Sequence, residues 1–99
     1  MIKRISCMPE TIRTLQETIN LRAYRGQFLI SVLDDLEDKI ENLYGEHGPK
    51  LRLEMMSDWK LTGEEKLAIF MNRSVVGYLF LRWRNDLFYS ADFVREEEK

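Results

Sequence analysis

The chain has 99 residues, of which 44% are hydrophobic and 32% charged, and its formal net charge is −2. This size and composition predict one soluble globular domain over residues 1–99 and exclude a general electrostatic attraction to nucleic acid or anionic membranes. The single cysteine excludes an internal disulfide and a thiolate metal site.

The basic N-terminus lacks the apolar run of a signal peptide, and the apolar stretches are too short to span a bilayer. We therefore expect a cytoplasmic protein with no membrane partner.

The first predicted element is a helical segment over residues 9–44. Pro9 suits a first helical turn, and the glycines and proline of residues 45–49 suit a stop. Between them, apolar residues recur in steps of three and four, which is the spacing of one helix face. Gly26 leaves two alternatives open: a continuous or kinked long helix, or a helical hairpin that turns near residues 24–26. The seam consists of Ile12, Leu15, Ile19, Leu29, Leu33, Leu36, Ile40 and Leu43, with Arg22 and Gly26 at the two steps between its halves.

A sheet segment is predicted over residues 50–84. Residues 51–61 alternate between apolar and polar side chains, and residues 75–83 are β-branched and aromatic, so both indicate strands. Residues 63–72 are either a third strand or a short helix, because Thr62 and Glu65 match a helix capping box. The predicted fold class is α+β, with a long N-terminal helix or helical hairpin packed on a small antiparallel sheet of two or three strands. Residues 85–99 are predicted as a C-terminal docking segment with a charged tail.

The length of the seam predicts self-association. A helix over residues 9–44 would be about 54 Å long, whereas a ten-residue strand spans about 33 Å, so a small sheet would leave part of the seam uncovered. We therefore expect a homodimer through a coiled coil. Residues 1–26 carry five bases and two acids, and residues 27–47 carry six acids and one base. This distribution favours antiparallel pairing, within or between chains. Arg22 in the seam needs an acidic partner or a route to solvent.

The predicted function is that of a non-enzymatic protein-interaction module, such as an adaptor, assembly factor or inhibitor. A short, block-charged chain of this kind would suit an accessory protein of a mobile element. It would bind a larger protein partner through its acidic segment and its C-terminal aromatic residues. The sequence lacks nucleotide-binding, zinc-binding and nucleophile motifs, so we expect no enzymatic activity and no catalytic, cofactor or metal site. The predicted partner-binding residues are Asp34, Asp35, Asp38, Phe88, Tyr89 and Phe93.

The alternative function is that of a nucleic-acid-binding accessory protein. Strand alternation places Tyr78 and Phe80 on the same face as Arg82 and Arg84. Aromatic rings interleaved with arginines hold single-stranded nucleic acid by stacking and phosphate contacts. The candidate residues for this function are Arg73, Arg82, Trp83 and Arg84.

Overall fold

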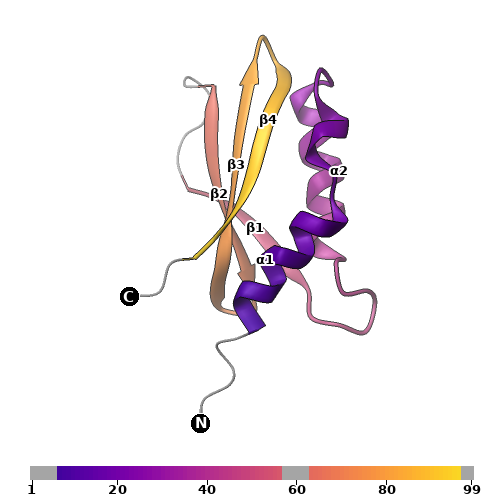
Figure 1. Ribbon diagram of the computed structural model, residues 1–99, viewed down its shortest axis with the longest axis vertical. Helices are drawn as coiled ribbons and strands as arrows, with labels where there is room; N and C mark the ends of the chain where they lie inside the picture. The colour runs from indigo at the N-terminus through magenta and orange to yellow at the C-terminus, as the bar shows by residue number, and fades with distance from the viewer. Residues whose placement is uncertain (1–6, 57–62, 97–99) are drawn as a thin grey trace.

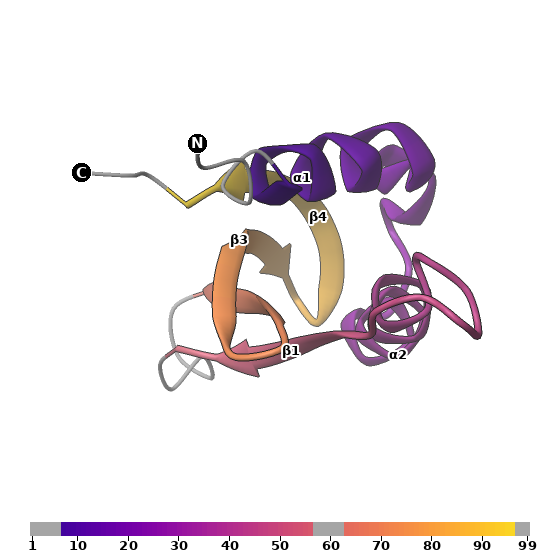
Figure 2. The same cartoon turned by 90° about the horizontal axis from the view of Figure 1, so that it is seen from below.

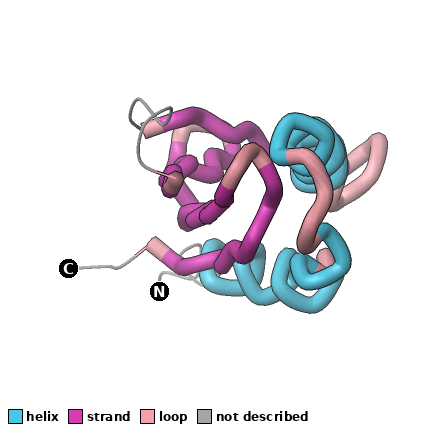
Figure 3. The backbone as a smooth tube through the Cα atoms, turned by 90° about the horizontal axis from the view of Figure 1, so that it is seen from above, coloured by secondary structure: helices cyan, strands magenta, loops and turns pink. Residues whose placement is uncertain are grey.

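The computed structural model describes residues 7–56 and 63–96 (Figure 1). The helical part consists of α1 (Cys7–Thr18), the 3-10 helix η2 (Leu21–Tyr24) and α2 (Leu29–Glu41). The strands that follow are β1 (Leu51–Met55), β2 (Glu64–Met71), β3 (Ser74–Arg84) and β4 (Leu87–Arg95). Helices and strands lie on opposite sides of the molecule (Figure 3), so the predicted α+β class is confirmed.

The strands form an antiparallel sheet in the order β1-β2-β3-β4. The prediction of two or three strands is wrong, because residues 87–95, predicted as a docking segment, form β4. Asn85 and Asp86 join it to β3, and both have positive φ angles, the conformation that a tight two-residue hairpin requires. The chain therefore turns back at once and pairs Leu87 with Arg84.

Residues 64–71 form β2, so the alternative of a short helix over residues 63–72 is wrong. The strand lies inside the sheet, with Leu67 and Ile69 buried on the helix side and Ala68 buried on the other side. Consecutive apolar residues such as these do not distinguish a strand from a helix by their period.

The predicted long helix is also wrong, because α1 ends at Thr18 and α2 begins at Leu29. The intervening backbone pairs with β4: the Gly26 N–H donates to the Phe88 carbonyl at 2.9 Å, and the Phe88 N–H donates to the Gln27 carbonyl at 2.8 Å. Gly26 has a φ of 87°, outside the helical region. The chain thus turns near the place given by the hairpin alternative, but the two helices pack mainly on the sheet (Figure 2).

The predicted coiled coil is absent from the described residues, because the apolar seam lies inside the protein. Six of the seam residues are at most 5% exposed and pack against the strands. The helices α1 and α2 have 12 and 13 residues, hence lengths of about 18 and 20 Å, which the 11-residue β3 can match. The six residues are Ile12, Leu15, Ile19, Leu29, Leu36 and Ile40.

The remaining seam positions have different surroundings. Leu33 and Leu43 are partly buried against the core, whereas Arg22 and Gly26 are exposed. Arg22 lies in η2 and Gly26 in the turn after it, so neither continues a helix face. In the described part of the chain, none of the helices is long and apolar enough to cross a membrane.

The helix α1 approaches the sheet closely at Gly77 of β3. A Cβ atom built on Gly77 would lie 2.4 Å from the Cδ1 atom of Ile12 and 2.6 Å from the carbonyl oxygen of Val94. Real Cβ atoms do not come this close to other heavy atoms. A residue without a side chain therefore lets α1 lie directly on β3.

Candidate functional site

The main candidate site is a groove of about 320 Å³ between α2 and the strands β1–β3. The helix contributes one wall, and the three strands contribute the floor and the other wall. Below, this feature is called the α2–β1 groove. Its lining residues are Leu29, Leu33, Glu37, Leu53, Met55, Glu65, Leu67, Leu81 and Trp83.

The floor of the α2–β1 groove is apolar and its rim is accessible. Leu67 and Leu81 are buried, while Met55 at the rim is 55% exposed and Trp83 is half-buried. Strand alternation accounts for this arrangement, because Leu79, Leu81 and Trp83 share the helix-facing side of β3. Because Met55 is largely exposed, part of this apolar surface stays open to solvent.

Two carboxylates border this apolar surface. Glu37 projects from α2 and is exposed, whereas Glu65 lies in β2 and is 5% exposed. Residues 29–41 of α2 carry five acids and one base, a net charge of −4. Asp34 and Glu41 lie three and four residues from Glu37, so the three share one flank of the helix. The groove is an apolar slot beside an acidic helix flank.

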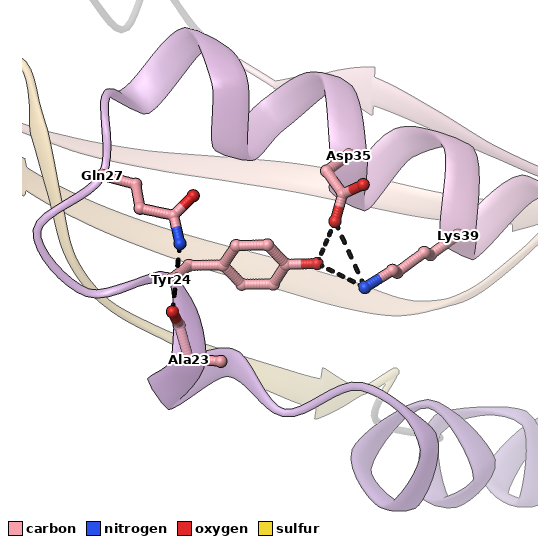
Figure 4. A network of polar contacts seen from close by, with 5 residues as sticks. All are labelled: Ala23, Tyr24, Gln27, Asp35 and Lys39. Carbon is pink, nitrogen blue, oxygen red and sulfur yellow. Dashed lines mark hydrogen bonds and ion pairs between the residues drawn. The ribbon is translucent and has the colours of Figure 1, made fainter.

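A polar network joins η2 to α2 on another side of the helix (Figure 4). The Tyr24 hydroxyl donates a hydrogen bond to the Asp35 carboxylate and accepts one from the Lys39 ammonium group at 2.9 Å, and Lys39 lies 3.2 Å from Asp35. The bonds from Tyr24 and Lys39 lower the pKa of Asp35, while burial, followed by the bond to Asp35, raises the pKa of Tyr24. We interpret this network as a structural contact that holds η2 against α2, since all three side chains already bond to one another.

The structure does not gather the predicted partner-binding residues into one surface. Phe88 and Phe93 are buried in the core, because β4 is an integral strand. Tyr89 is 44% exposed, and the guanidinium groups of Arg25 and Arg84 lie 5.2 and 5.3 Å from its ring centroid. Asp34 and Asp38 are exposed on α2, and Asp35 belongs to the network with Tyr24.

The sheet face opposite the helices carries the aromatic residues of the nucleic-acid alternative. The Lys66 ammonium group lies 4.4 Å from the ring centroid of Tyr78 and 5.7 Å from that of Phe80. Arg82 lies 3.4 Å from the Asp92 carboxylate and donates to the Ser90 hydroxyl at 3.2 Å. The rings are thus covered by a cation, and the arginine is paired with an acid, which leaves less of either for bases and phosphates.

The four residues predicted to bind nucleic acid do not share a surface. Arg73 lies in the turn before β3, whereas Arg84 ends that strand, about 35 Å away for a strand of this length. Trp83 lines the α2–β1 groove on the helix side, and Arg82 faces the other way.

Sequence reasoning missed the α2–β1 groove as a site. The alternation in residues 51–55 already places Leu53 and Met55 on one face of a strand. It does not show that a groove remains between α2 and that face, because the groove depends on how α2 packs against the sheet.

Comparison with protein-family models, curated proteins and solved structures finds no match to this chain. Among residues 7–56 and 63–96, no three or more histidine, cysteine, aspartate or glutamate side chains gather in a metal-binding arrangement. The chemistry of the groove is therefore the remaining guide to function.

Proposed function

We propose that this protein is a non-enzymatic protein-interaction module that binds a segment of a partner protein in the α2–β1 groove. The observation that carries this proposal is the combination of an open apolar slot with an acidic helix flank. The partner segment would place an apolar side chain in the slot and lysine or arginine side chains beside Glu37.

The size and lining of the groove support this assignment. A volume of about 320 Å³ lies at the lower end of the range for small-molecule sites, so it suits a few side chains better than a large cofactor. Aromatic and methionine side chains such as Trp83 and Met55 are enriched at protein interfaces. The half-buried rim lets a ligand cover apolar surface that water now contacts.

The acidic flank determines the charge of the expected partner. Five acids against one base on α2 repel phosphate groups and attract cationic side chains. The groove therefore favours a basic protein segment over nucleic acid. Lysines and arginines along the flank would also accelerate association at low salt.

The experiment is an NMR titration of the labelled protein with two amphipathic probes. The first is a nine-residue peptide with leucine at its centre, lysine two residues to either side and threonine elsewhere. The second is an alanine-based helical peptide that carries leucine and lysine on one face. Shifts of the Leu53 and Trp83 amide signals with either probe support the proposal. No shift with either probe at low salt would refute it.

A matched pair of variants tests the role of charge in the groove. Glu37→Lys and Asp38→Lys change the same charge on neighbouring exposed positions of α2, but only Glu37 lines the groove. We expect Glu37→Lys to weaken probe binding by about tenfold, the effect of about 1.4 kcal/mol, and Asp38→Lys to weaken it much less. Equal effects would mean that the helix attracts the probe only by its overall charge.

The homodimer stays a prediction. The seam that suggested it is covered within the chain, and exposed apolar residues on the described surface now include Phe28 and Ile30 instead. Sedimentation equilibrium measures the mass in solution and tests this prediction directly.

A further inference from the structure

The outer edge of the sheet at β1 lies beside the α2–β1 groove. Among the described residues, β1 pairs with β2 only. The opposite edge of the sheet is partly occupied, because the segment around Gly26 and Gln27 bonds to Phe88, and the Gln16 side chain donates to the Phe93 carbonyl at 3.0 Å. Within residues 7–56 and 63–96, β1 is therefore the edge strand that has no second partner, and an unpaired edge is a template for another strand.

The register shows which backbone groups of β1 point outward. The Met56 N–H donates to the Lys66 carbonyl at 3.1 Å, and in an antiparallel pair bonded and non-bonded positions alternate. Arg52 and Glu54 therefore share with Met56 the positions that bond to β2. The N–H and C=O groups of Leu53 and Met55 then point away from the sheet.

The two outward-pointing positions also belong to the groove. The side chains of Leu53 and Met55 line it, so one stretch of backbone presents both a hydrogen-bonding edge and an apolar slot. Glu37 lies on the wall opposite these strand residues. An extended chain placed along β1 would bond to the edge while alternate side chains entered the groove.

We propose that the partner segment binds in extended form as an additional strand on β1. This inference rests on the proposed function and specifies how the groove is used. Backbone groups of the segment bond to those of Leu53 and Met55, one apolar side chain fills the slot, and a lysine or arginine two residues away lies beside Glu37. Strand addition of this kind takes its affinity from main-chain bonds and its specificity from pockets for alternate side chains.

Charge complementarity favours a basic partner over a second copy of this chain. Two copies paired edge to edge through β1 would bring two acidic flanks, each with Asp34, Glu37 and Glu41, towards each other. Like charges facing one another across an interface oppose association. A segment with lysines or arginines would instead be attracted to the same flank.

A pair of substitutions at Met55 separates the backbone edge from the groove side chain. Met55→Ala and Met55→Pro both remove the methionine side chain, but only proline removes the N–H group. That N–H points outward and is not used in pairing with β2, and proline is tolerated at such edge positions. Far-ultraviolet circular dichroism and thermal unfolding of both variants would show whether the fold is kept.

The probe is the nine-residue leucine–lysine peptide, titrated by NMR into the wild type and both variants. We expect Met55→Ala to weaken binding about threefold and Met55→Pro to weaken it at least about tenfold, because only the latter loses a main-chain bond. Equal binding by the two variants would overturn the strand-addition proposal.

Methylated peptides test the same bond from the side of the ligand and do not depend on the fold of the Met55→Pro variant. The peptide is N-methylated either at its leucine and lysine amides or at the intervening threonine amides. In a strand, alternate amides point to opposite edges, so we expect one of these sets to abolish binding and the other to preserve it. Binding of both methylated peptides as strongly as the parent would overturn the proposal.

The two proposals fail in different ways. If only the helical peptide shifts the Leu53 and Trp83 signals, the groove binds partners but strand addition is wrong. If neither peptide shifts them, both proposals are wrong. If light scattering shows that the chain itself doubles in mass and Met55→Pro abolishes this doubling, the occupant of the edge is a second copy and not a basic partner.

Discussion

The substitution Gly77→Ala tests whether α1 lies on the sheet. The added methyl group would meet Ile12 at 2.4 and 2.7 Å and the Val94 carbonyl oxygen at 2.6 Å, and Ile12 is almost fully buried. Overpacking of this kind costs about 1–3 kcal/mol, while replacement of glycine by alanine within a strand recovers about 0.5–1 kcal/mol. Since the Val94 oxygen belongs to the backbone of β4, a side-chain rotation alone cannot relieve the clash. We expect a net loss of about 1–2 kcal/mol in the free energy of unfolding.

Urea unfolding followed by circular dichroism measures this loss, with Ser74→Ala as a control at an exposed position of the same strand. The control should change stability by less than about 0.5 kcal/mol. The double variant Gly77→Ala and Ile12→Ala should lose less stability than the sum of the two single variants, because removal of the isoleucine makes room for the methyl group. If Gly77→Ala is neutral, α1 does not lie on β3, and Ile12 is again available for a partner helix.

Three further substitutions test the core, the polar network and the former seam. Leu36→Ala should lower the free energy of unfolding by about 2–5 kcal/mol, because Leu36 is fully buried, and a loss below about 1 kcal/mol in urea unfolding would contradict that burial. The pKa of Asp35 is lowered in the folded protein, so its ionised carboxylate stabilises the fold at pH values above the ordinary aspartate pKa of about 3.9. This stabilisation is lost as the pH falls through the lowered pKa. Tyr24→Phe should therefore raise the pKa of Asp35 in an NMR titration, and an unchanged pKa would show that the hydroxyl does not bond to it. Arg22→Leu should leave the melting temperature and the mass by light scattering nearly unchanged, because Arg22 is exposed. A higher melting temperature or a larger mass would instead support an apolar helix face that pairs with another helix.

The sequence by itself determined the class of the fold and which side chains share one face of each element. Apolar steps of three and four identified Ile12, Leu15, Leu36 and Ile40 as one side of a helix, and these residues are buried. Strand alternation likewise separated Leu79 and Leu81 from Tyr78 and Phe80, and the structure keeps that separation. Such patterns are local, because a side chain's direction follows from the period of its own element.

Only the tertiary structure decided what those faces contact. The same apolar spacing fits a long helix in a dimer and two short helices on a sheet. The backbone hydrogen bonds that join Gly26 and Gln27 to Phe88 show that the chain adopts the second arrangement. The sequence could not show this, because the bonding partners lie about sixty residues apart along the chain. The α2–β1 groove depends likewise on how α2 packs against the strands, which residues distant in the sequence decide together.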